Sequence, residues 1–144
     1  MSFLEMFIVV MAMILFATTA IVHHQALATA ADQVTNASHT VQSMQLAQEV
    51  LDEIDARLFA PQSTNLKHSQ IIIQYGGTQR EYDLAHYGAQ FHLDINAEPC
   101  DRFGSTTAQY EPNVLVTVLV TGPAGQRHPI RLSRIYVPFS VEGL

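Results

Sequence analysis

One acidic side chain stands alone in a long apolar stretch at the start of the chain. Glu5 lies in this stretch, and Asp32 is the next charged residue. A charged side chain costs roughly 2.5–3.5 kcal/mol at the centre of a bilayer and less near its edge, so an acid here needs a partner. The nearest cation is the α-amino group of Met1, on the same copy or a neighbouring one, because the first Lys or Arg is Arg57. The sequence therefore predicts an ion pair between the Glu5 carboxylate and an α-amino group.

A second group of side chains with ligand chemistry lies near the middle of the chain. Asp94, Asn96, Glu98 and Asp101 carry oxygen atoms at nearly alternate positions, which resembles the start of a calcium loop. Two prolines, a glycine and several small polar residues predict a long surface loop over 96–112. No Glu follows at the twelfth position. We therefore expect a solvated acidic loop, with calcium as the alternative and no other cofactor.

The remaining reactive residues predict no catalytic site. His23 and His24 are adjacent, and neighbouring side chains on a helix point about 100° apart, so a polar collar is favoured over a shared metal ion. Cys100 is the single cysteine, which excludes an intrachain disulfide and predicts a small buried residue. The sequence has no nucleophile-elbow serine, phosphate-binding glycine loop or HExxH motif. We expect a protein that is not an enzyme.

Composition indicates how these residues are positioned. The chain of 144 residues is 48% hydrophobic but 14% charged, against roughly 25% charged in an average soluble domain. Residues 6–22 are apolar, and with 1–4 they provide about twenty residues of helix, enough to cross a bilayer. A secretory signal peptide is disfavoured because no positive region precedes the stretch. A net charge of −6 gives no electrostatic reason to bind nucleic acid.

The first residues, Met-Ser-Phe-Leu-Glu-Met-Phe-Ile-Val-Val, resemble the mature N-terminus of type IV pilins and pseudopilins. In that family a prepilin peptidase cuts just before residue 1, the new amine is usually methylated, and Glu is fifth. The resemblance covers about the first 25 residues closely. This chain has Ile14 and Val22 where the family often has Gly and Pro, and it lacks the family's C-terminal cysteine pair.

The resemblance implies that Glu5 and the amine of Met1 set the register between subunits of a helical filament. The apolar side chains around them would form the filament core. The implied core residues are Phe3, Leu4, Phe7, Ile8, Val9, Val10, Ile14, Leu15, Phe16, Ile21 and Val22.

The stretch that follows predicts an amphipathic continuation of the helix. Apolar residues recur at steps of three and four from residue 34 onward, typical of a helix with one buried face. Those residues are Val34, Ala37, Val41, Met44, Ala47, Leu51, Ile54 and Leu58. Because no Gly or Pro occurs before Pro61, we expect one helix over 1–60. Residues 1–23 form the membrane or filament-core segment, and 24–60 pack on a head.

The sequence predicts that the head, residues 61–144, is a small antiparallel sheet. A β-branched run over 70–75, the pair Gly76-Gly77 and the stretch 78–84 indicate a hairpin. Alternation of apolar and polar residues predicts a strand over 91–95. Residues 114–120 are apolar enough for a central strand covered by the helix. After a turn at 122–125, residues 130–137 are expected to form a fifth strand. The expected fold class is α+β with a pilin-like plan.

These features lead to three functional hypotheses. The first is a structural subunit of a type IV pilus-like filament, a single-pass protein of the cytoplasmic membrane before assembly and an extracellular surface filament afterwards. Its partners would be other copies, the prepilin peptidase and the assembly machinery. The second is a type II secretion pseudopilin. The third is a single-span anchored binding module that forms no polymer.

Overall fold

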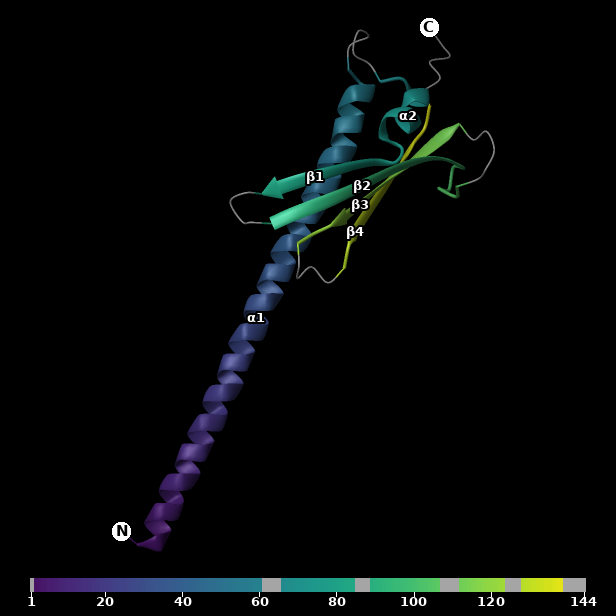
Figure 1. Cartoon of the computed structure of the whole chain (residues 1–144). Coiled ribbons are helices and arrows are strands. Elements are labelled where there is room, and N and C mark those ends of the chain that lie inside the picture. Colours follow the sequence, from purple (N-terminus) through teal and green to yellow (C-terminus); the bar gives the residue numbers. More distant parts are fainter. Residues whose placement is uncertain (1, 61–65, 85–88, 107–111, 124–127, 139–144) are drawn as a thin grey trace. The chain divides into compact units, whose positions relative to one another are not determined.

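The computed structural model describes residues 2–60, 66–84, 89–106, 112–123 and 128–138. The chain separates into two compact units, Met1–Ala37 and Ser38–Leu144, called here the first and second units. Figure 1 shows the elements along the chain. They are the helix α1 (Phe3–Leu58), a short 3₁₀ helix η1 (His68–Gln70), the helix α2 (Ile71–Tyr75) and the strands β1 (Thr78–Leu84), β2 (Ala89–Cys100), β3 (Asn113–Thr121) and β4 (Ile130–Tyr136).

The long N-terminal helix is present as predicted. α1 contains 56 residues without Gly or Pro, and the absence of these helix breakers explains its length. It ends at Leu58, two residues before the expected end at 60. Pro61, the predicted stop, lies outside the described residues.

The four strands form one antiparallel sheet in the order β1-β2-β3-β4. The register places Tyr82 opposite Phe91, Leu93 opposite Val120 and Val118 opposite Leu132. Alternate residues of β3 are buried, namely Val114, Val116, Val118 and Val120. The prediction of a central strand over 114–120 is therefore confirmed, with one face fully buried and the other half-exposed.

The predicted first strand over 70–75 is wrong. Ile71–Tyr75 is a helical turn, and its i,i+4 pair Ile71 and Tyr75 is buried, at 0% and 1% exposure. Gly76 ends this helix by donating its N–H to the backbone oxygen of Ile72, and a Cβ at Gly76 would lie 2.5 Å from that oxygen. Gly77 follows with φ of 70°. The glycine pair is thus a helix C-terminus, and the sheet described here has four strands instead of five.

The predicted loop over 96–112 is also wrong in its first part. β2 continues to Cys100 with buried and exposed residues alternating through Ala97, and its register with β3 extends to Asn113. The pairing of β1 stops at Ile95. Pro99 therefore lies in a stretch that pairs on one side within the described sheet, where a strand tolerates the missing N–H of proline.

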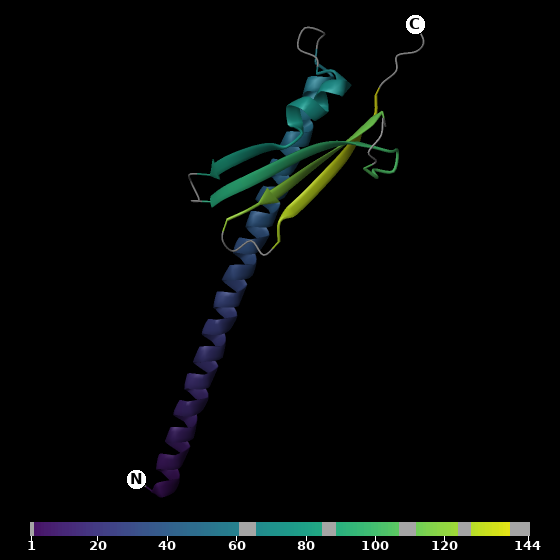
Figure 2. The same cartoon turned by 45° about the vertical axis from the view of Figure 1, so that its right-hand side comes forward.

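The core of the second unit forms where the end of α1 crosses one face of the sheet, as Figures 1 and 2 both show. Val50, Leu51 and Ile54 of the helix are at most 1% exposed and belong to one cluster with Phe91 and Leu93 of β2. The predicted apolar stripe is correct from Ala47 onward and wrong before it. Val34, Val41 and Met44 are exposed, whereas Ser43 and Leu46 are buried.

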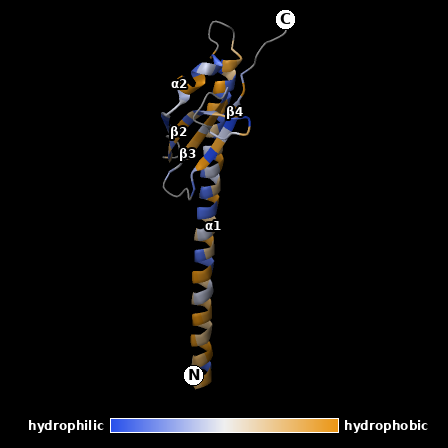
Figure 3. Ribbon diagram, turned by 90° about the vertical axis from the view of Figure 1, so that its right-hand side faces the viewer, coloured by the Kyte–Doolittle hydropathy of each residue, from blue (hydrophilic) through white to orange (hydrophobic). Residues whose placement is uncertain are grey.

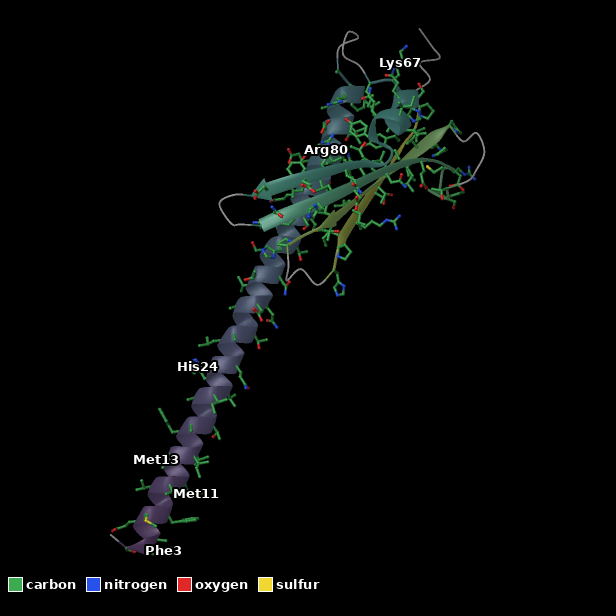
Figure 4. All side chains as sticks on the ribbon, viewed as in Figure 1. Phe3, Met11, Met13, His24, Lys67 and Arg80 are labelled. Carbon is green, nitrogen blue, oxygen red and sulfur yellow. The ribbon has the colours of Figure 1, made fainter. Side chains whose placement is uncertain are left out.

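An ion cluster centred on Glu53 attaches α1 to β1 and α2 within the second unit. Arg80 donates two hydrogen bonds to the Glu53 carboxylate at 2.6 and 3.3 Å, and the Tyr75 hydroxyl donates a third at 3.0 Å. Arg57 lies 2.9 Å from the same carboxylate. Hydrogen bonding from Arg80 holds the pKa of Glu53 below its ordinary value, and burial raises the pKa of Tyr75. Figure 4 marks Arg80 beside α1.

A second cluster attaches the same helix to β4. Arg134 forms an ion pair with Asp55 and lies 3.7 Å from Asp52. The hydroxyl of Tyr136 donates to the backbone oxygen of Leu51 at 3.1 Å, and burial raises the pKa of Tyr136. Arginines from both edge strands of the described sheet therefore contact acidic side chains near the end of α1, which fixes how this part of the helix lies on the sheet.

Acid should weaken the second unit through Glu53. Because its pKa is lower in the folded chain than in the unfolded chain, its contribution to stability is complete above about pH 4.5 and is lost as the pH falls through the lowered pKa. We expect Glu53→Gln to be less stable at pH 7 and to lose less stability between pH 5 and 3. Thermal unfolding followed across this range measures the difference. Parallel curves for the two proteins would contradict it.

Candidate functional site

The candidate site is the apolar segment Phe3–Val22 of α1, in the first unit. Each predicted core side chain is exposed, from 46% for Val9 to 82% for Phe3. Hydrophobic colour covers this part of the helix in Figure 3, and Figure 4 labels Phe3, Met11 and Met13 on it. The exposed large apolar side chains of the segment are Phe3, Leu4, Met6, Phe7, Ile8, Val9, Val10, Met11, Met13, Ile14, Leu15, Phe16, Ile21 and Val22.

These positions occupy every side of the helix, because they include long runs of consecutive residues. A helix that is apolar all round is stable when something apolar surrounds it. Among the described residues, α1 is the one helix long and apolar enough to cross a membrane, and 0% of its most apolar window is buried within the structure. The segment therefore differs from the core helix of a soluble protein, which its own fold covers.

Glu5 takes part in a reciprocal cap at the start of α1. The N–H of Ser2 donates to Oε2 of Glu5 at 2.9 Å, and the N–H of Leu4 donates to the hydroxyl oxygen of Ser2 at 3.3 Å. This is the pattern of a capping box, in which a serine and a glutamate three residues later satisfy free N–H groups of the first turn. The role of Ser2 was not predicted, although the spacing Ser-x-x-Glu before an apolar run signals such a cap.

The cap leaves the Glu5 carboxylate able to accept a further hydrogen bond or ion pair. A carboxylate has two oxygen atoms with several acceptor positions, and the bond from Ser2 uses one of the two. The acidic side chain also lies in the first turn of the helix, at the positive end of the helix dipole. Met1, whose amine is the predicted partner, lies outside the described residues, so their pairing stays a prediction.

The polar side chains inside the segment satisfy their own hydrogen bonds. Thr18 and Thr19 both donate to the backbone oxygen of Leu15, at 3.0 and 2.7 Å. Farther along α1, outside the segment, Thr29 and Thr35 donate to the backbone oxygen four residues earlier, at 2.9 and 3.0 Å. Such bonds let a threonine leave water without an unpaired hydroxyl. They make the helix compatible with lipid or with a dry helix bundle.

Removal of the cap should loosen the first turn. Substituting a serine N-cap by alanine costs about 1 kcal/mol, so we expect Ser2→Ala to speed hydrogen exchange of the Leu4 amide about five-fold. Ser38→Ala, which changes an exposed serine within the same helix, should leave that amide unchanged. Exchange measured by NMR on the full chain in nanodiscs tests this. Equal protection in Ser2→Ala and the unaltered chain would show that the cap contributes nothing.

No protein-family model, curated protein or solved structure matches this chain.

The other residues singled out by sequence are not brought together. Asp94, Asn96 and Glu98 alternate along the exposed side of β2 instead of lining a loop, because the strand extends farther than predicted. Asp94 accepts a bond from Gln79 at 2.8 Å, and Glu98 accepts one from Asn96 at 2.6 Å. Asp101 accepts the N–H groups of two residues in its own turn, both at 2.8 Å. The loop that the calcium hypothesis required is therefore absent from this stretch of the described chain.

The histidine pair and the cysteine are located as the sequence suggested. His23 and His24 are both exposed on α1. Over the residues that the structure describes, no three His, Cys, Asp or Glu side chains form a group that could hold a metal ion. Cys100 is buried at the end of β2, which confirms the prediction of a small buried residue.

Proposed function

We propose that this chain is a structural subunit of a type IV pilus-like helical filament. The observation that supports the proposal most is the apolar segment Phe3–Val22, exposed on all sides and interrupted by a single charge, Glu5. In a plain membrane anchor that charge would serve only the cap at the start of the helix. A segment that leaves lipid to pack against copies of itself needs a polar group to set its register, much as a single polar residue does in a coiled coil.

The proposed mechanism is physical. The subunit waits with its apolar segment in the cytoplasmic membrane, and the carboxylate of Glu5 is attracted to the α-amino group of a subunit already in the filament. Their pairing neutralises both charges in a medium of low dielectric, where an ion pair is far stronger than in water. The apolar side chains then exchange lipid for neighbouring helices. The second units supply the outer surface of the filament.

The alternatives within and outside this class predict different behaviour. A type II secretion pseudopilin would share the assembly step, and deletion of its gene would abolish protein export instead of removing long surface filaments. A single-span anchored binding module would form no polymer and would run as one monodisperse species after extraction in detergent. The apolar segment is common to all three. Polymer formation separates the anchored module from the two filament subunits, and the deletion phenotype separates the pilus subunit from the pseudopilin.

The N-terminus of the protein from its natural host tests the proposal chemically. We expect mass spectrometry to find a chain that begins at Met1 with a methylated α-amine, and the gene to encode a short basic leader ending in glycine just before it. A formylated or unprocessed N-terminus without such a leader would contradict the proposal, because subunits of the family that the chain resembles are cut just before residue 1.

A further inference from the structure

A cavity of about 670 Å³ lies in the second unit. It forms where the end of α1, the residues before η1 and the end of β4 meet. Leu58, Leu66 and Tyr136 line it, and Leu66 and Tyr136 are nearly fully buried. Its volume lies within the roughly 300–1,000 Å³ typical of pockets for small molecules. The pilin-like proposal does not use this cavity.

The cavity exposes apolar surface that an occupant would cover. Phe59 and Val137 also line it and are 71% and 59% exposed. Large apolar side chains gathered beside a hollow, with a few polar groups, are typical of a binding site. The occupant therefore needs an apolar body.

The charges around the cavity determine what else the occupant carries. Arg134 is paired with Asp55, and His68 lies 3.0 Å through Nε2 from the backbone oxygen of Tyr136. Within the described residues Lys67 has no ion pair, and it lines the same cavity. Figure 4 labels Lys67 at this end of the second unit. A local positive charge in a chain of net charge −6 favours an anion.

We propose that the cavity binds a small organic acid, with an apolar body against Leu66 and Val137 and one carboxylate paired with Lys67. A lysine ammonium is a compact point charge, whereas the planar fork that suits phosphate is the guanidinium of Arg134, already used by Asp55. A singly charged carboxylate therefore fits better than a phosphate. The site does not depend on filament assembly.

The test uses the full chain in lipid nanodiscs, which leave no free detergent to enter the cavity. The probes are 3-phenylpropanoate, its neutral amide and the cationic 3-phenylpropylamine, all with the same apolar body. We expect the carboxylate to shift the methyl NMR signals of Leu66, Ile135 and Val137 saturably, and the amide to bind about ten-fold more weakly. Lys67→Gln should weaken carboxylate binding by a similar factor. Arg102→Gln removes an exposed positive charge outside the cavity and should leave binding unchanged.

Three results would overturn the proposal. The first is no saturable shift at these methyl groups. The second is an equal response to all three probes, or an equal loss in Lys67→Gln and Arg102→Gln, since either shows that the charge of Lys67 does not select the ligand. The third is a shift that follows protein concentration without any probe, which would assign the cavity to a second copy of the chain. Lys67 is exposed, and an unchanged spectrum elsewhere verifies that its variant folds.

Discussion

Glu5→Gln should abolish filament assembly while leaving the start of α1 intact. Glutamine at the third position of a capping box still reaches back to the N-cap N–H, so the bond to Ser2 is kept and the charge is lost. An α-amine left unpaired in the filament core would cost roughly 3–5 kcal/mol, as removal of one partner of a buried ion pair does. That corresponds to a loss of at least about two orders of magnitude in subunit addition. Counting surface filaments by electron microscopy measures it.

The comparison with two further variants separates registry from capping. Glu5→Ala removes both the charge and the bond from the Ser2 N–H, and we expect it to fail as completely as Glu5→Gln. Glu49→Gln changes an exposed acid farther along the same helix and should assemble normally. If Glu5→Gln assembles like the unaltered chain while Glu5→Ala does not, the cap is the function of Glu5 and the register hypothesis is wrong.

Phe91→Ala should strongly destabilise the second unit. The side chain is 0% exposed near the start of β2, and its ring meets that of His39 edge-on at 6.3 Å between centroids. Truncating a buried phenylalanine costs roughly 3–5 kcal/mol, against about 5–15 kcal/mol of total stability for a typical domain. Native-state hydrogen exchange of the β2 and β3 amides in the full chain measures the loss.

Phe103→Ala is the matched control for that change. It removes the same side chain from a position that is 77% exposed, where we expect a change within about 0.5 kcal/mol. If both variants lose similar protection, burial against α1 is not what stabilises the sheet. If neither variant loses protection, Phe91 does not belong to the core that stabilises the sheet.

The sequence predicted most of the fold where a pattern was long or strictly periodic. The uninterrupted helix follows from the lack of Gly and Pro before residue 61, and the positions of β1, β3 and β4 follow from composition and turns. The strand prediction for 71–75 was wrong because three isoleucines favour a strand locally. In the fold, Ile71 and Tyr75 pack on one side of a turn, which favours a helix. Burial in the tertiary structure decided against the local preference.

The length of β2 was also predicted wrongly. Pro99 argued for a loop because proline has no N–H, and the missing partner strand beyond Ile95 was not visible in one sequence. The ion clusters around Glu53 and Arg134 were also beyond reach, because they join residues 27 and 79 positions apart. Ser2 could have been found, since its spacing from Glu5 is a local signal.

The measurement that tests the central claim most directly is an electron cryomicroscopy reconstruction of the polymer from cells that naturally produce the chain. We predict a helical filament in which the segments Phe3–Val22 pack against one another around the axis. In it, the carboxylate of Glu5 lies within about 4 Å of the α-amine of a neighbouring subunit. A chain found dispersed in the membrane, or a polymer whose subunits meet through the sheet units while these segments stay in lipid, would contradict the account.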